Sequence, residues 1–537
     1  MNKLTHKLSY TLSYALSHAT LLSGICLALT ACGGGGSGTQ TATPTQPTQP
    51  VQTTWQLGVY PASSELQNLC ANPRTGIDEY TGTRFADKTG SAFLEKMWLR
   101  SWTNETYLWA NEVADKDPNS FSDVASYFAQ LKTTATTASG KPKDYFHFSR
   151  SYEDYAKESL KGETAGYGVH WAFLSNVPPR VLKVAYVTAD TAATQAGLQR
   201  GDQILAIDGV DINDSTETGI AALNAALSPQ QGKSHQFLVK TVLGEQRQIT
   251  MTASNYQQRP VQGSKVIEHA GKKIGYVQFN QFISVAQPDL ISTIELFRNS
   301  DVNALVLDMR YNGGGLLALS SQLGYMIAGP GRTSGRVFSK AIDNGKGNLY
   351  DNAAQQTTAF YNREIDYQAG KFTNTALPDL DLDTVYILTT GNTCSASESL
   401  INGLLGIDVN VVLIGTTTCG KPYGFFPTQN CGTVYYSIQF KGSNEKGFAD
   451  FTDGFSPTQN PQTEAQVKGC TVSDDFNHAL GNEQEAMLAG ALQHLATGQC
   501  PAAKPQLAPR PAPDGKPLAI PSNVFDNGTI VLPLREI

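Results

Sequence analysis

Apolar runs and helical patterns alternate along the second half of the chain. Four runs predict buried or half-buried β-strands, at residues 273–279, 304–309, 384–389 and 411–414. Three stretches of helical period fall between these runs, at residues 288–297, 316–327 and 397–405. Apolar strands separated by helices of this length predict an α/β core with largely parallel pairing, which we place at residues 258–500.

The chain upstream of this core has two parts of different pattern. In residues 54–160 the aromatic side chains of Trp98, Trp102, Tyr107 and Trp109 recur near helical spacing, and residues 121–131 also fit an amphipathic helix. We interpret the aromatics as the core of a small helical N-terminal domain; a surface stack that binds carbohydrate is the alternative. In residues 161–257, short β-rich runs predict a second, β-rich domain, at 181–187, 203–207 and 236–242.

The β-rich part carries a glycine pattern typical of a peptide-binding module. Gly166-Tyr167-Gly168-Val169 is followed by Gly-Leu-x-x-Gly-Asp-x-Ile at residues 197–204. This order resembles the PDZ domains of bacterial proteases. The resemblance implies that backbone N–H groups at Tyr167, Gly168 and Val169 hold a peptide carboxylate beside an exposed strand edge. A small β-domain that binds nothing is the alternative; the chain itself ends in an apolar residue, Ile537, so docking of its own end is a further hypothesis.

The first 31 residues have the pattern of an export signal. Lys3 and Lys7 precede an apolar run at residues 20–31, which is too short to span a bilayer. Residues 29–32, Leu-Thr-Ala-Cys, resemble the lipobox of bacterial lipoproteins, which implies cleavage before Cys32 and lipidation of its thiol. A plain signal peptide with a chance cysteine is the alternative. Residues 32–53 predict a flexible linker and residues 501–537 a Pro-rich tail without a domain.

Composition narrows the classes of partner. With 537 residues, of which 40% are hydrophobic and 16% charged, the chain is long enough for several globular domains. A formal net charge of -7 provides no basic surface for nucleic acid. The residue after the lipidated cysteine is Gly33 and not aspartate, which by resemblance to enterobacterial lipoprotein sorting favours the outer membrane. We therefore expect a lipid-anchored protein of the bacterial cell envelope, at the outer membrane facing the periplasm or the cell surface, with polypeptides and the membrane as partners.

The cysteines indicate an oxidising compartment. Of eight cysteines, Cys26 leaves with the signal and Cys32 carries lipid, so six remain, an even number that favours disulfides. None of them lies in a C-x-x-C pair, and the chain has no H-E-x-x-H motif. We therefore expect neither a zinc site nor another cofactor.

Two segments of the core carry candidate groups for acyl chemistry. Residues 305–316 run from a buried strand into a glycine-rich turn, whose free backbone N–H groups at a helix N-terminus are suited to stabilise an oxyanion. Ser395 follows the next buried strand and begins a helix, where its hydroxyl faces the same kind of N-terminus. Ser395-x-x-Glu398 also fits a capping box, which needs no catalysis, and both interpretations can hold together.

A third segment supplies a candidate base. Lys421 stands between a glycine and a proline and before three aromatic residues, a setting that predicts burial. Burial of an ammonium lowers its pKa, so that a neutral amine becomes available near pH 7. A surface or phosphate-binding lysine is the alternative, although the glycines of a P-loop are missing.

These segments, in this order and after a PDZ pattern, resemble the C-terminal processing peptidase family, whose members share an α/β fold of the crotonase type. The family signatures D-L-R-x-N-x-G-G, S-A-S-A-S-E and T-F-G-K match residues 308–315, 393–398 and 418–421. The resemblance implies that Ser395 is the nucleophile and Lys421 its general base, with the N–H groups of Gly314 and Ala396 as oxyanion donors. It also implies a serine endopeptidase that cleaves exported proteins and recognises substrate C-termini through the PDZ domain.

The chain departs from the family pattern beside the site. Cys394 and Cys419 replace small or aromatic residues, and Phe425 stands where several relatives carry a glutamine that orients the lysine amine. The third catalytic residue is therefore open, and the candidates are Glu398, Gln429 and Gln439.

Cys394 and Cys419 flank the two residues proposed for catalysis. Because both would lie close to one centre, we expect a disulfide that ties the nucleophile loop to the lysine loop. The other four cysteines are then expected to pair as Cys431 with Cys470 and Cys70 with Cys500.

Three other hypotheses compete with a Ser-Lys peptidase. A Ser-His enzyme would need a remote histidine such as His269 or His478, since residues 391–426 contain none. A cysteine hydrolase would use Cys394, a thiol that tends to oxidise in an exported protein. A non-catalytic lipoprotein would hold peptides in the PDZ domain and the cleft, although the presence of both the serine and the lysine argues against it.

Overall fold

The computed structural model describes residues 54–137, 139–346, 356–502, 517–518 and 529–530. The predicted signal and linker, with Cys32, lie outside these residues, as does most of the predicted tail. Within the described ranges, none of the helices combines the length and the apolar character needed to cross a bilayer.

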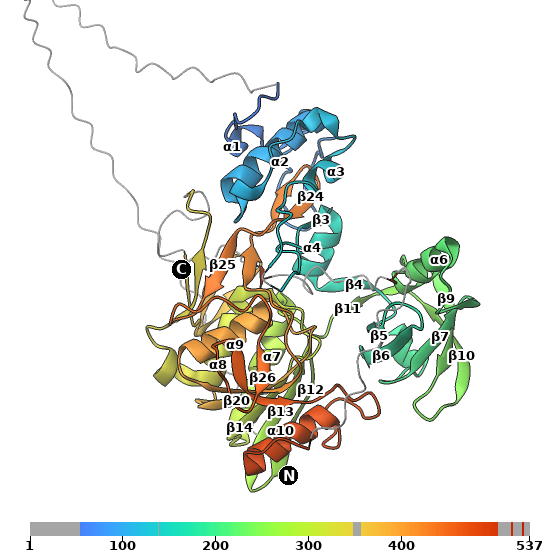
Figure 1. Ribbon diagram of the computed structural model, residues 1–537, viewed down its shortest axis with the longest axis vertical. Coiled ribbons are helices and arrows are strands. Elements are labelled where there is room, and N and C mark those ends of the chain that lie inside the picture. Colours follow the sequence, from blue (N-terminus) through green and yellow to red (C-terminus); the bar gives the residue numbers. More distant parts are fainter. Residues whose placement is uncertain (1–53, 138, 347–355, 503–516, 519–528, 531–537) are drawn as a thin grey trace, which may run out of the picture. The chain divides into compact units, whose positions relative to one another are not determined.

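A seven-stranded sheet lies at the centre of the α/β core (Figure 1). Its order is β12-β13-β14-β20-β21-β27-β26, and all neighbours pair in parallel except β12, which is antiparallel to β13. The strands are β12 (Val261–His269), β13 (Lys272–Phe279), β14 (Ala304–Asp308), β20 (Thr384–Thr389), β21 (Asn410–Gly415), β26 (Ser456–Thr458) and β27 (Gln466–Thr471). The predicted α/β core with largely parallel pairing is confirmed.

Alternate residues of the central strands pack against different layers. Leu305 and Leu307 of β14 belong to one hydrophobic cluster, whereas Ala304 and Val306 belong to another on the opposite face. Successive side chains of a strand point to opposite faces of the sheet, so a strand covered on both faces must be apolar throughout. This double burial explains the continuous apolar run in the sequence.

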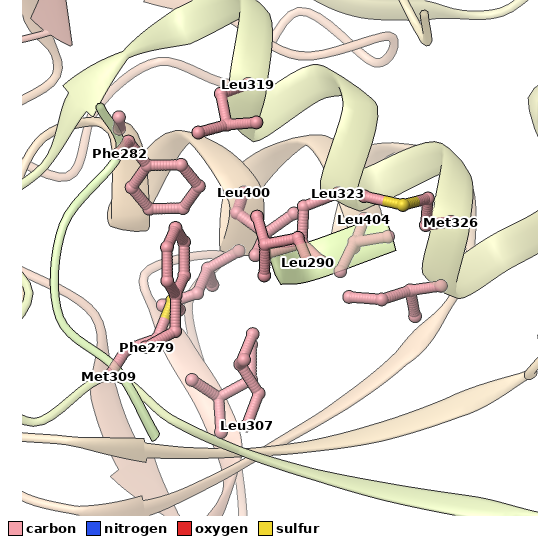
Figure 2. Close-up of a cluster of buried hydrophobic side chains, with 14 of the residues drawn as sticks. Phe279, Phe282, Leu290, Leu307, Met309, Leu319, Leu323, Met326, Leu400 and Leu404 are labelled. Atoms are coloured by element: carbon pink, nitrogen blue, oxygen red, sulfur yellow. The ribbon is translucent and has the colours of Figure 1, made fainter. Parts of the chain in front are cut away.

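Helices cover both faces of the sheet. The first cluster receives side chains from α7 (Gln287–Asn299), α8 (Leu317–Thr333) and α9 (Ala396–Gly406), and the second receives them from α10 (Ala486–Thr497). Figure 2 shows leucines of these three helices packed with Phe279 and Leu307, which belong to the sheet. Packing in the core therefore fixes where α8 and α9 begin. The glycine turn lies just before α8, and Ser395 lies directly before α9.

The β-rich part forms a separate six-stranded sheet with the path β10-β9-β7-β6-β5, and β8 pairs with β7. Its elements are β5 (Val169–Ser175), β6 (Val181–Val187), α5 (Ala192–Gln195), β7 (Gln203–Ile207), β8 (Val210–Asp211), α6 (Glu217–Leu227), β9 (Ser234–Lys240) and β10 (Gln246–Thr252). A ribbon of β4 (Glu163–Gly166) and β11 (Ser254–Gln257) joins it to the rest of the chain. The sheet leaves β5 at its edge, as the PDZ resemblance predicts.

Aromatic residues form the core of the N-terminal part. Trp98 and Trp102, on α2, are buried and stack with ring centroids 5.3 Å apart, so the core interpretation holds for them. The helix predicted at 121–131 is shorter, because Asp123 accepts the N–H of Ser126 and starts it only at residue 124. The elements are α1 (Ser63–Leu66), β1 (Leu69–Cys70), β2 (Lys88–Thr89), α2 (Ala92–Thr106), α3 (Val124–Phe128), β3 (Phe148–Ser151) and α4 (Tyr152–Lys161).

The N-terminal part shares its packing with the core. β3 pairs with β24, which pairs with β23, and Tyr435 of β24 lies in the same hydrophobic cluster as the two tryptophans. A further six-stranded sheet has the order β15-β28-β22-β25-β16-β17. The remaining strands are β15 (Gly315–Leu316), β16 (Val337–Ile342), β17 (Thr357–Ala359), β18 (Arg363–Asp366), β19 (Lys371–Ala376), β22 (Tyr423–Phe425), β23 (Thr428–Asn430), β24 (Thr433–Tyr436), β25 (Phe440–Ser443) and β28 (Thr529–Ile530).

Three disulfides join the described cysteines. The predicted Cys394–Cys419 bond is present. The other two predicted pairings are wrong, because Cys70 bonds Cys431 and Cys470 bonds Cys500. Cys431 lies in the turn before β24, and β24 packs against the N-terminal part, which contains Cys70. Cys500 follows α10, which lies on the core sheet, so it comes close to Cys470 in β27. Long-range packing of this kind decides the pairing and leaves no signal in the cysteine spacing.

Candidate active site

The three segments with candidate chemistry meet at one edge of the central sheet. β14 ends at Asp308 before the glycine turn, β20 ends at Thr389 before Ser395, and β21 ends at Gly415 before Lys421. These strands are parallel neighbours, so their carboxyl ends lie side by side. Ligand sites of open α/β sheets form at this edge.

Ser395 occupies the tight connection between β20 and α9. Its backbone has φ 61° and ψ -110°, a conformation that residues with a Cβ rarely adopt. The side chain is fully buried, and the backbone N–H donates to Glu398 Oε2 at 2.9 Å. The predicted capping interaction from Glu398 is thus present, and it holds Ser395 at the N-terminus of α9.

Glu398 links the nucleophile loop to the lysine loop. Besides the N–H of Ser395, its buried carboxylate accepts the backbone N–H groups of Gly420 and Lys421, each at 2.8 Å, and the hydroxyl of Thr418 at 2.5 Å. Burial raises the pKa of Glu398, whereas the four donors oppose this rise. Glu398, a candidate third catalytic residue, thus contacts the backbone of Lys421.

The amine of Lys421 lies in an aromatic cage. Its Nζ is buried without a hydrogen-bond partner among the described residues, 4.0 Å from the ring centroid of Phe146 and 4.6 Å from that of Phe425. Burial lowers the pKa of Lys421 well below its ordinary value, and the charges of Asp144 and Glu398 oppose this only in part. The predicted burial of the lysine is present, and Phe146, from the N-terminal part, supplies a wall that no motif indicated.

The glycine turn approaches the nucleophile closely. A Cβ at Gly314, whose φ is +112°, would lie 2.8 Å from Ser395 Cβ and 3.0 Å from the nitrogen of Ala396. No residue with a side chain fits there. The N–H of Gly314 donates to Asn312 Oδ1 at 3.0 Å, and the carbonyl of Asn312 accepts the N–H of Cys394 at 3.0 Å. The turn and the nucleophile loop are therefore bonded to each other, and the Gly314 donor is engaged within the turn.

The Cys394–Cys419 disulfide adds a covalent link between the two loops, with Cα atoms 5.2 Å apart. Both sulfurs and a Glu398 oxygen lie within 4.8 Å of one another, a spacing that a metal ion could use. The disulfide removes both thiolates, so these residues do not fit a metal. It also leaves Cys394 without the free thiol that a cysteine hydrolase needs.

The other candidates for a third catalytic residue have different contacts. Gln439 Oε1 accepts the N–H of Phe426 at 2.7 Å, and Gln429 lies against the guanidinium of Arg74.

The two histidines of the Ser-His hypothesis have other partners. His269 lies opposite Lys272 in the pairing of β12 with β13, at the opposite end of the sheet from the catalytic loops. His478 pairs with Asp475 at 2.6 Å. These contacts give no support to a role of either histidine beside Ser395.

One cavity of about 950 Å³ joins the PDZ part to the catalytic loops. Its wall includes the predicted carboxylate loop Tyr167-Gly168-Val169 and, from the core, Gly313, Cys394 and Cys419. His170 also lines it; burial lowers its pKa to about 4, so this ring is neutral near pH 7. The strand pattern had indicated no role for His170.

A buried ionic network connects the PDZ part to the glycine turn. Arg200 donates to the hydroxyl of Tyr311 at 2.7 Å and to Asp474 at 2.5 Å. Asp474 also pairs with Arg310 at 2.7 Å, and Arg310 is paired in turn with Asp308 and Glu485. Tyr311 directly precedes the turn, so Arg200 of the PDZ part is hydrogen-bonded to the residue next to the turn.

Two protein families match this chain. Residues 273–433 match the model of peptidase family S41, and residues 183–231 match that of the PDZ domain. These matches, together with relatives that are C-terminal processing peptidases, confirm the resemblance predicted from three motifs. Family S41 comprises serine-type peptidases.

Curated relatives match over part of their length. A carboxyl-terminal-processing protease of Picosynechococcus is 29% identical over 49% of this chain and 56% of the relative. The chloroplastic carboxyl-terminal-processing peptidase 1 of Arabidopsis thaliana is 25% identical over 67% of each chain. The chain thus spans between half and two thirds of these relatives. A crystal structure described as an S41 protease from Bacteroides fragilis has the same fold, with a TM-score of 0.55, 22% identity, and coverage of 75% of this chain and 97% of that one.

Proposed function

We propose that this chain is a serine endopeptidase that cleaves exported polypeptides with Ser395 as nucleophile and Lys421 as general base. The observation that carries the proposal is the buried amine of Lys421, without a hydrogen-bond partner among the described residues, in a loop that Glu398 ties to the backbone of Ser395. A lysine in this setting has its pKa lowered by burial, which gives the neutral amine that a base requires.

The proposed reaction has two steps. Ser395 Oγ attacks the scissile carbonyl carbon while the amine of Lys421 takes its proton, and the ammonium then gives that proton to the leaving amine. Water hydrolyses the acyl-enzyme with Lys421 again as base. The N–H groups of Ala396 and Gly314 would stabilise the oxyanion in both steps. For Gly314 this requires exchange of its hydrogen bond to Asn312, so the described conformation fits a resting enzyme better than one bound to substrate.

The proposed substrates are unfolded or extended chains with a free, apolar C-terminus. The cavity that contains both the Tyr167–Val169 loop and the walls of the catalytic centre supports this proposal. A peptide whose carboxylate is held by the loop can extend along β5, the edge strand, toward Ser395.

We also propose export and lipidation at Cys32, which place the enzyme in the bacterial cell envelope at the outer membrane. The three disulfides of the described part support an oxidising compartment. Mass spectrometry of the membrane fraction is expected to find a mature chain that begins with a lipid-modified Cys32. A mature chain that begins elsewhere would remove this part of the proposal.

The activity is tested by labelling with a fluorophosphonate and by hydrolysis of unfolded casein. The wild-type chain is expected to react at Ser395 and to hydrolyse casein, whereas Ser395→Ala does neither. Ser399→Ala, on the same helix, is the matched control and should behave like the wild type. A folded wild-type chain that neither labels nor cleaves would favour the non-catalytic peptide-binding lipoprotein.

A further inference from the structure

Two described pieces of the predicted Pro-rich tail, residues 517–518 and 529–530, contact the folded part. At the first, Leu518 is 2% exposed and belongs to the hydrophobic cluster of the PDZ part. Its backbone N–H donates to the carbonyl of Asn176 at 3.0 Å. Asn176 directly follows β5, so the tail bonds to the continuation of the edge strand.

This contact lies at a defined end of the peptide-binding edge. Val169, beside the proposed carboxylate loop, begins β5, and Ser175 ends it. The cavity wall follows the strand from Val169 to Leu174, two residues before Asn176. A peptide added to this edge with its carboxylate at the loop would therefore bring an upstream residue to the place where Leu518 lies.

The second contact lies beside the catalytic loops. Thr529 and Ile530 form β28, which pairs in parallel with β15 on one side and β22 on the other. β15 begins directly after Gly314, and β22 begins two residues after Lys421. The same short strand thus joins the segments that follow the oxyanion turn and the lysine.

We infer that the chain's own C-terminal segment is an intramolecular ligand: residues 517–518 dock on the PDZ edge and residues 529–530 beside the catalytic loops, where the segment competes with substrates. This inference rests on the proposed recognition of substrate C-termini by the PDZ domain. Leucine is a suitable anchor because burial of its side chain removes apolar surface from water, which stabilises the contact. A charged residue at position 518 would be excluded from the same apolar site.

Hydrogen exchange tests the docking itself. In full-length Ser395→Ala protein, which cannot digest itself, segments containing Leu518 and residues 173–178 are expected to exchange slowly. Leu518→Asp should accelerate exchange in both. Leu243→Asp makes the same change at a described leucine of the PDZ part that is 86% exposed, and it should leave the exchange unchanged. Fast exchange at Leu518 in the parent, or no effect of Leu518→Asp, overturns the inference.

Peptide binding tests the competition. A fluorescent decapeptide with a free apolar C-terminus should bind Leu518→Asp about tenfold more tightly than the parent, if the tail occupies roughly nine molecules in ten. Leu243→Asp should bind like the parent. Equal affinity of Leu518→Asp and the parent overturns the competition. If no variant binds the peptide while Leu518 remains protected from exchange, tail docking stands and the proposed role of the PDZ domain fails.

Truncation separates the two contacts. A chain that ends at Ile530 keeps the Leu518 contact and β28, and it is the control. A chain that ends at Gly528 loses β28, and a chain that ends at Pro517 loses both contacts. Casein hydrolysis by truncated active enzyme is expected to exceed the control only when a contact is removed. If the chain ending at Pro517 is folded, as judged by its thermal transition, and no more active than the control, the tail is not a competitor.

Discussion

The backbone N–H of Lys421 donates to Glu398 at 2.8 Å, and the same carboxylate oxygen accepts the N–H of Ser395 at 2.9 Å. The nucleophile and the proposed base are therefore positioned by one buried acid rather than by a direct contact between their backbones. The hydrogen-bond donors to Glu398 are three backbone N–H groups and the hydroxyl of Thr418. Because Glu398 holds the two loops through these groups, we assign it a positioning role.

Glu398→Gln is expected to lower kcat by at least about 100-fold. A glutamine keeps one acceptor oxygen but turns an NH2 group toward N–H donors, and an unsatisfied buried donor costs about 1–3 kcal/mol. Steady-state kinetics on a peptide substrate should show the loss mainly in kcat, with a small change in KM. Glu295→Gln, on the exposed side of α7, is the control for the same substitution. A variant with wild-type kcat would show that the Glu398 bonds do not position the catalytic loops.

The disulfide beside the site is expected to support both stability and activity. Replacing Cys394 and Cys419 together by serine opens a loop with a sequence separation of 25 and should cost about 3 kcal/mol of unfolding free energy. Activity should fall as well, because the bond joins the loops of Ser395 and Lys421. Replacing Cys470 and Cys500, with a separation of 30, is the matched control. It should lower stability by a similar amount and leave kcat per folded molecule unchanged; an equal loss of kcat in both variants would refute a local role.

Gly168→Ala is expected to remove the preference of the PDZ domain for a free carboxylate. A Cβ at Gly168 would lie 2.2 Å from Thr191 Oγ1, so the carboxylate loop must shift. Gly209→Ala has the same positive φ, +79°, but no atom within 4 Å of the new Cβ, and it controls for backbone strain. Calorimetry measures this preference as the difference in affinity between a free peptide and the same peptide with an amidated C-terminus. The wild type and Gly209→Ala should prefer the free acid; indifference of the wild type would reject the proposed loop.

The sequence was informative where local chemistry decides structure. Apolar runs predicted the strands of the core because those strands are covered on both faces, and the motifs placed Ser395 and Lys421 on loops that do meet at one edge of the sheet. The contacts that complete the site come from distant segments. Phe146 reaches Lys421 from the N-terminal part, and no spacing rule connects two such positions.

The wrong disulfide pairings have the same physical origin. Cys70 meets Cys431 because β3 pairs with β24, a contact between segments far apart in the sequence. The tail provides another case, since Pro-rich composition predicted no domain there and gave no sign of the apolar site that Leu518 fills. In each case tertiary packing decided the outcome.

The charge of Lys421 makes the stability of the protein depend on pH. Burial lowers its pKa in the folded state, so between the folded and unfolded pKa values the unfolded chain binds more protons. Stability should therefore rise with pH across this window, which ends near the ordinary lysine value of about 10.4. Lys421→Met should remove this rise and increase Tm by roughly 5 °C near pH 7, because it no longer buries an amine that can be protonated. Lys340→Met, at an exposed position, should change neither the rise of stability with pH nor Tm.

Activity should follow the same titration. Turnover is expected to rise with pH as Lys421 loses its proton, without a step at the ordinary histidine value of about 6.5. Lys421→Arg keeps the positive charge but cannot accept a proton, so it should be as inactive as Lys421→Ala, a loss of at least about 1,000-fold in kcat. Kinetics from pH 5 to 10 on folded variants provide the measurement. If Lys421→Arg stays active while replacement of His269 or His478 abolishes turnover, the base is a histidine and the Ser-Lys mechanism is wrong.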